Sequence, residues 1–224
     1  ESMGPSQSVS FDGGTTGANT AGVRNYMFEM DDWSGDGQIE SNYNLTNIAS
    51  GSTLDIGLGG NGGNLFDLEF FNLGLVAGED TSATVNLHVG NDSQWDDFRV
   101  DNTHTLTINA IDAEIGGFEH YVTIGNSSTF EGNELTTLNL TNDGDVYINM
   151  WGIDSPNLAT IDASTMTERA DLVLDDVADA IDVTTGRGSD RIIGNDATTA
   201  YTITTGDGFD DGVNDDGNDY VETN

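Results

Sequence analysis

A short phrase of glycine and aspartate, G-x-G-x-D, occurs twice between Thr184 and Asn224. Its residues are Gly186, Gly188 and Asp190 in the first copy and Gly206, Gly208 and Asp210 in the second, twenty positions later. Glycines at alternate positions let a tight turn adopt backbone angles that are closed to other residues, and they leave the carbonyl oxygens uncovered. The aspartate adds a carboxylate oxygen to the same turn. Carbonyl and carboxylate oxygens are the ligands that Ca²⁺ takes, so the spacing predicts calcium-binding turns.

Two looser copies of the phrase accompany these turns. They are Gly194-Asn195-Asp196 and Gly217-Asn218-Asp219. We expect each turn to supply half of a site, which a second turn stacked on it completes. The carboxylate ligands would be Asp190, Asp196, Asp210 and Asp219. The alternative is that these are ordinary glycine-aspartate turns that hold no ion.

A separate acidic loop lies nearer the start of the chain, where Asp32, Ser34 and Asp36 alternate and Gly37 follows. Alternate residues on a tight loop face one centre, and the glycine permits the sharp turn. The pattern resembles the first half of an EF-hand-type calcium loop. Its twelfth position is Tyr43, where that motif has a bidentate glutamate. A calcium loop and a solvated acidic turn are therefore both open at this point.

The charge of the chain is strongly negative. Forty acidic residues face five basic ones among 224, there is no cysteine, and the formal net charge is −35. Such a charge repels nucleic acid and anionic lipid, and the lack of cysteine excludes disulfides and thiolate metal sites. Bound divalent cations, very high salt or disorder could each accommodate this negative charge. Because 35% of the residues are hydrophobic and fall in strand-like patterns, disorder fits worst. Many acids lie beside glycine in turns, which favours cations over a halophile's evenly spread surface charge.

The elements that must position these turns are strands. From Leu45 onward, short runs of alternating apolar and β-branched residues are closed by Gly, Asn or Asp, which predicts an all-β fold. Three runs share one phrasing: Leu106–Ala110, Leu138–Asn142 and Ala159–Ala163. Their spacing of twenty to thirty-two residues suits the coils of a parallel β-solenoid, with Asn and Asp forming ladders at equivalent turns. An antiparallel β-sandwich is the competing architecture for the first hundred residues.

The composition divides the chain into four regions. Residues 1–22 are rich in Gly, Ser and Thr and read as a lead-in or linker. Residues 23–103 form an N-terminal β region with the acidic loop, and residues 104–183 a β-solenoid region. Residues 184–224 carry the glycine-aspartate turns. No run of eighteen apolar residues occurs, so we expect no membrane insertion.

The G-x-G-x-D phrase followed by an apolar residue resembles the core of the calcium-binding nonapeptide repeat of RTX proteins. The resemblance implies a parallel β-roll, calcium between successive turns, and folding when calcium arrives outside the cell. Thr185 and Thr205 stand where that family has a leading glycine. The spacing of twenty also differs from the family's nine or eighteen, so the resemblance does not imply a regular roll.

No catalytic motif accompanies the turns, and we expect no enzyme. The three histidines, His88, His104 and His120, are sixteen residues apart, and we expect hydrogen-bonded surface residues rather than a metal centre. The three tryptophans, Trp33, Trp95 and Trp151, lie among acids and glycines. Each is either a sugar-stacking platform or a partly buried cap over the core, and the cap is the more common case.

The solenoid-like strands, the absence of lysine and cysteine, and the closing G-x-G-x-D turns together look like bacterial surface-layer proteins and adhesins exported by type I secretion. Leu135–Asp196 carries this resemblance most clearly, with L-T-x-L-x-L, L-A-x-I-D-A-S and T-G-x-G-x-D. It implies a calcium-dependent extracellular structural protein that self-assembles on the cell surface through calcium-bridged edges, with cell-surface polysaccharide as a further partner. The alternatives are a secreted β-helical polysaccharide-acting enzyme or carbohydrate-binding adhesin domain, and a halophile's surface protein without specific ions.

Overall fold

The computed structural model describes residues 7–12, 25–30, 39–58, 66–89, 93–112, 120–125, 130–143, 146–195, 198–206 and 219–223. These residues form strands and turns and contain no helix, hence none that could cross a membrane. The first sheet has ten strands: β1 (Gln7–Asp12), β3 (Ile39–Ile48), β5 (Phe66–Leu75), β7 (Ser93–Asp101), β9 (His120–Ile124), β10 (Phe130–Glu131), β12 (Val146–Asp154), β14 (Ala170–Asp176), β16 (Arg191–Gly194) and β18 (Tyr220–Thr223). The second sheet has eight: β2 (Asn25–Met30), β4 (Ser52–Leu58), β6 (Ser82–Val89), β8 (Thr105–Asp112), β11 (Thr137–Asp143), β13 (Thr160–Ala163), β15 (Ala180–Thr185) and β17 (Ala200–Thr204).

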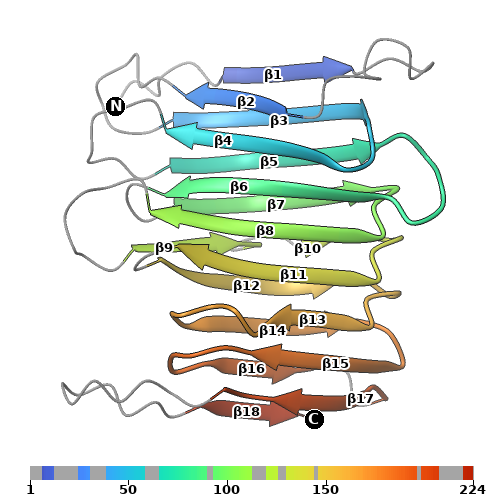
Figure 1. Cartoon of the computed structure of the whole chain (residues 1–224), viewed down its shortest axis with the longest axis vertical. Helices are drawn as coiled ribbons and strands as arrows, with labels where there is room; N and C mark the ends of the chain where they lie inside the picture. Colours follow the sequence, from blue (N-terminus) through green and yellow to red (C-terminus); the bar gives the residue numbers. More distant parts are fainter. Residues whose placement is uncertain are drawn as a thin grey trace.

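The chain alternates between the two sheets, and the described strands within each sheet pair in parallel (Figure 1). β9 and β10 interrupt the alternation, because both lie in the first sheet between β7 and β12. The prediction of an all-β fold with parallel strands is confirmed, and the pairing is compatible with a β-solenoid. The antiparallel sandwich expected as an alternative for the first hundred residues is wrong. Alternating burial along a strand does not report the direction of its neighbours, which the connections decide.

The register confirms the repeat seen in the sequence. Leu138 pairs with Leu106 on one side and with Ile161 on the other, so the three similar runs occupy equivalent positions. The separation between stacked residues changes along the chain: it is 31 between Asp55 and Asn86 but 20 between Asp171 and Arg191. The coils therefore differ in the length of their turns, while their strands stay in register.

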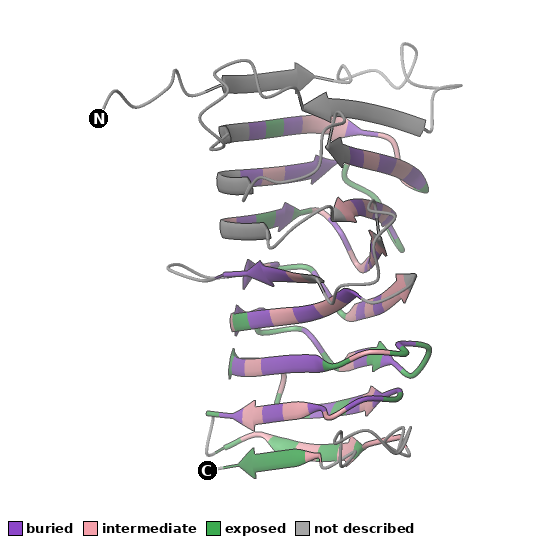
Figure 2. Cartoon of the chain, turned by 90° about the vertical axis from the view of Figure 1, so that its left-hand side faces the viewer, coloured by how far each residue is buried: buried purple, intermediate pink, exposed green. Residues whose placement is uncertain are grey.

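The core lies between the two sheets and is made of side chains at alternate strand positions, as in β12. Figure 2 shows this alternation as bands of buried and half-buried residues along the middle strands. Four rings, Tyr43, Phe71, Phe98 and Phe130, stack one per strand across the first sheet. Their centroids are 6.5, 4.6 and 5.4 Å apart. Aromatic packing therefore ties successive coils together along the axis of the stack.

A ladder of polar side chains runs along the other face of the second sheet. Asn86 donates to Asp55 (2.7 Å), Asn109 donates to Asn86 (3.4 Å), and Thr141 donates to Asn109 (2.9 Å). The sequence predicted such ladders at the turns, whereas this one lies within β4, β6, β8 and β11. It forms there because in-register parallel strands place equivalent residues side by side on successive coils.

The N-terminal end of the stack differs from the sequence prediction, and the C-terminal end is less buried than the middle. Gln7–Asp12, inside the predicted lead-in, is a strand that pairs with β3. A boundary between two regions was expected at residues 103 and 104. Strand pairing continues across it, since β6 pairs with β8 and β7 with β10. At the C-terminal end, β18 is exposed at each described position, with Tyr220 51% and Val221 46% exposed. Burial therefore falls off toward the last coil (Figure 2).

Candidate functional site

The first G-x-G-x-D turn joins β15 to β16 and packs directly against the turn of the preceding coil. A Cβ atom on Gly186 would overlap the carbonyl oxygen of Met166 and lie 3.0 Å from that of Ala163. Arg187 N donates to Met166 O at 2.9 Å across the same contact. Only a residue without a side chain can lie this close to the neighbouring backbone, so the glycine is required by stacking.

Gly188 and Gly206 extend the same arrangement. Gly188 has a φ of +106°, and a Cβ there would lie 2.8 Å from Arg169 N, so both its conformation and its surroundings exclude a side chain. A Cβ on Gly206 would overlap the carbonyl oxygen of Gly186. The first glycine of the second copy therefore lies against the first glycine of the first copy, one coil later. The spacing of twenty residues, which departs from the RTX repeat, is the length of one coil in this part of the chain, since Ala180 pairs with Ala200.

Asp190 lies at the end of this turn, just before β16, and is 1% exposed. The sheet register places it between Ala170 of the preceding coil and Asp219 of the next. Its Oδ1 accepts a hydrogen bond from Ala170 N at 2.8 Å, and its own backbone N–H donates to Asp219 Oδ1 at 3.1 Å. Tyr220 N also donates to Asp190 O at 2.8 Å. Two aspartates thus bond to the backbone of the preceding coil in the same way.

The second oxygen of the Asp190 carboxylate is buried and has no hydrogen-bond partner, and the same holds for the hydroxyl oxygen of Thr185. The Thr185 hydroxyl lies close enough to lower the pKa of Asp190, but the pair does not reach hydrogen-bond geometry. Burial outweighs this effect and raises the pKa of Asp190 to about 6. A buried carboxylate oxygen without a donor costs about 1–3 kcal/mol or more when charged, and a positive ion would remove that cost.

The ligand types available here fit calcium better than a transition metal. Among the described residues, no group of three or more His, Asp or Glu side chains is close enough to hold a metal ion. Around Asp190, the described residues also offer the Thr185 hydroxyl oxygen and the backbone carbonyl oxygens of the stacked turns. Calcium accepts such oxygens in an irregular shell of six to eight, whereas zinc requires a few nitrogen, sulfur or carboxylate ligands.

The structure brings together Gly186, Gly188, Asp190, Gly206 and Asp219 from the predicted sites. The remaining predicted ligands lie outside the described residues: Asp32, Ser34, Asp36, Asp196, Gly208 and Asp210. Sequence reasoning missed Thr185, whose hydroxyl faces Asp190. The sequence did carry a signal for this residue: Thr185 and Thr205 both stand where the RTX repeat has its leading glycine.

The other candidates from the sequence were the three histidines and the three tryptophans. His104 Nδ1 lies 2.8 Å from Thr81 Oγ1, and His88 Nε2 lies 3.6 Å from Asp55 Oδ1, so both described histidines contact polar neighbours. Trp151 is 41% exposed on β12, between the buried Met150 and the half-buried Gly152. The side chains of Trp33, Trp95 and His120 lie outside the described ones.

Comparison of the chain with protein-family models, with curated proteins and with solved structures finds no match.

Proposed function

We propose that this chain is a calcium-dependent structural module, a β-solenoid whose glycine-aspartate turns bind Ca²⁺ near the C-terminal end. The observation that carries the proposal is the buried, unpartnered Oδ2 of Asp190 in a turn where glycine backbones of consecutive coils are in contact. A divalent cation would satisfy this oxygen and draw on the carbonyl oxygens of the stacked turns.

Calcium binding and folding would then be coupled. Without the ion, the chain must bury the Asp190 carboxylate with one oxygen unpaired, next to an Asp219 that bonds to its backbone. With the ion, the same carboxylate holds one coil to the next. An ion that binds the folded coils and not the unfolded chain stabilises them in proportion to its concentration.

The proposed setting is the bacterial cell surface. A net charge of −35 with no lysine suits a protein that meets millimolar calcium outside the cell, and the resemblance to type I-secreted surface-layer and adhesin-like proteins points the same way. In this proposal, copies of the module associate through calcium bridges between acidic edges, as a lattice or filament. The role is structural rather than catalytic.

The test is a calcium titration of the parent protein and of Asp190→Asn, followed by calorimetry and circular dichroism. Asparagine keeps an oxygen for the Ala170 N–H but removes the charge. We expect the substitution to remove at least one calcium site and most of the calcium-dependent stabilisation of the C-terminal coils. Asp182→Asn, at an exposed position of neighbouring β15, is the matched control and should bind as the parent does. Equal calcium binding by the parent and Asp190→Asn would overturn the proposal.

The same experiment separates specific calcium binding from general charge screening. The melting temperature is measured with a chelator, with and without molar sodium chloride. We expect sodium chloride to leave most of the chelator's effect in place, because monovalent ions screen surface charge but do not satisfy a buried oxygen. Full recovery in sodium chloride would instead support the halophilic alternative.

A further inference from the structure

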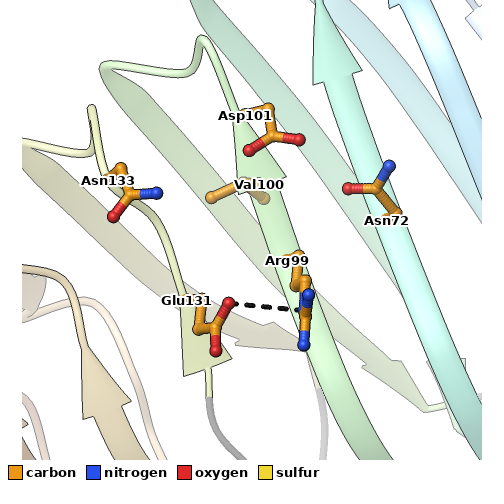
Figure 3. A pocket seen from close by; sticks show the side chains of 6 residues that line it. All are labelled: Asn72, Arg99, Val100, Asp101, Glu131 and Asn133. Atoms are coloured by element: carbon orange, nitrogen blue, oxygen red, sulfur yellow. Dashed lines mark ion pairs between the residues drawn. The ribbon is translucent and has the colours of Figure 1, made fainter.

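The face of the first sheet that points away from the core carries a polar groove of about 260 Å³. Six residues line it, from three neighbouring strands and the segment after β10: Asn72, Arg99, Val100, Asp101, Glu131 and Asn133 (Figure 3). Val100 is its one apolar lining residue and is itself buried. The groove lies in the middle of the stack, on different coils from the glycine-aspartate turns.

The sheet register creates the groove. Arg99 pairs with Asn72 on β5 and with Glu131 on β10, so three consecutive coils place their polar side chains in one row. Arg99 Nε lies 3.3 Å from Glu131 Oε2 and 3.0 Å from Asp97 Oδ1. On the other side, Asn72 Nδ2 donates to Asn44 Oδ1 at 2.9 Å. These contacts orient the side chains of Arg99, Glu131 and Asn72 along the groove.

The charges in the groove restrict what it can bind. Two carboxylates, in a chain of net charge −35, oppose an anionic ligand. The guanidinium of Arg99 opposes a bare metal cation. A single apolar residue offers little to a lipid or an apolar peptide side chain. The ligand that remains is neutral and rich in both hydroxyl donors and hydroxyl acceptors.

We propose that this groove binds a neutral saccharide. The carboxylates of Asp101 and Glu131 accept hydrogen bonds from sugar hydroxyls, while Arg99 and the Asn133 amide donate to hydroxyl oxygens. Hydrogen bonds to charged groups are about twice as strong as neutral ones. Because neighbouring coils are spaced about 4.8 Å apart, an extended glycan lying across the strands meets a new set of polar groups at each coil.

Trp151 adds an aromatic surface to the same face. It lies on β12, the strand paired with β10, and is 41% exposed between the buried Met150 and the half-buried Gly152. An exposed indole can pack against the apolar face of a sugar ring while its edge stays hydrated. Trp151 lies outside the groove lining, on the coil after Glu131, and offers a stacking surface there.

The test uses a panel of neutral hexose oligosaccharides, with oligouronates of matched length as the anionic comparison, on the full chain with calcium present. Binding is measured by calorimetry and located by NMR. We expect at least one neutral oligosaccharide to bind and the oligouronates to bind at least tenfold more weakly. Asp101→Asn and Asn133→Ala should each weaken binding about tenfold, since each removes a hydrogen bond to the ligand.

Two comparisons keep the proposal falsifiable. Both substituted residues are exposed, so the parent melting temperature should be retained. Asp182→Asn, on the second sheet, should leave saccharide binding unchanged. Binding by no neutral member of the panel, preference for the oligouronates, or equal weakening by Asp182→Asn would each overturn the proposal. Such a result would not affect the calcium proposal, which depends on other residues.

Discussion

The middle coils and the C-terminal coils of this chain are held together by different forces. In the middle, the rings of Phe71, Phe98 and Phe130 are fully buried and stacked between the sheets. Toward the C-terminal end, β17 has no fully buried position and β18 is exposed throughout. There the stacked turns are joined by glycine backbones and by aspartates that accept backbone hydrogen bonds.

The difference indicates where cation dependence should appear. Apolar burial requires no ion, so coils built on the aromatic stack should be stable with or without calcium. The coil of β15 and β16 buries the Asp190 carboxylate beside Ile181, Val183 and Ile192, and the next coil, β17 and β18, has no buried position among its described residues. In a stacked array, each coil is stabilised mainly by its neighbours, so the two regions can respond separately.

The largest effect is expected in the middle. Phe98→Ala removes the ring between Phe71 and Phe130 and leaves a cavity, which should lower the free energy of unfolding by about 3–5 kcal/mol. The loss should be the same with calcium and with a chelator, as measured by chemical denaturation. A loss of stability that appears only with the chelator would contradict the inference that the middle coils do not depend on calcium.

A smaller and more local effect is expected in the turns. Gly186→Ala forces a Cβ into the Met166 carbonyl, and overpacking of this kind costs about 1–3 kcal/mol. Hydrogen exchange should show lost protection in the C-terminal coils and retained protection in β5 and β7. Gly78→Ala is the control, because its Cβ would lie 3.6 Å from Thr81 Cγ2 in ordinary contact. Similar losses in both variants would contradict the stacking argument.

A further effect is a pH dependence of the calcium-free protein. Burial raises the pKa of Asp190 to about 6, above the value near 3.9 of an unfolded chain. Between these values the folded state binds more protons, so this group's contribution to stability is present below pH 4 and is lost as the pH rises through 6. A difference of about two pKa units corresponds to a loss of about 3 kcal/mol at most. Asp190→Asn should remove this part of the pH dependence; an unchanged profile would show that Asp190 is not its source.

Much of the fold followed from the sequence. Alternation predicted strands at Leu106–Ala110, Leu138–Asn142 and Ala159–Ala163, and the register stacks them, with Ile161 rather than Ala159 beside Leu138. The direction of pairing was not predictable for the first hundred residues, because alternation is compatible with parallel and antiparallel neighbours alike. The aromatic stack was not predicted either, since its rings are separated by coils of unequal length.

The candidate sites divide in the same way. The G-x-G-x-D phrase identified Asp190, but the unpartnered oxygens of Asp190 and Thr185 became visible only when the turns were stacked. Nothing in the sequence connected Asn72, Arg99 and Glu131, which lie on three separate strands.

The sequence alone determined what is local: where most of the strands lie, which of their positions face inward, where glycine is needed, and how much negative charge must be accommodated. The tertiary structure decided which coil lies beside which. That register turns one aspartate into a buried, half-satisfied carboxylate and three distant polar residues into a groove. The physical reason is that alternation and turn formation depend on neighbours in sequence, whereas burial and side-chain pairing depend on neighbours in space.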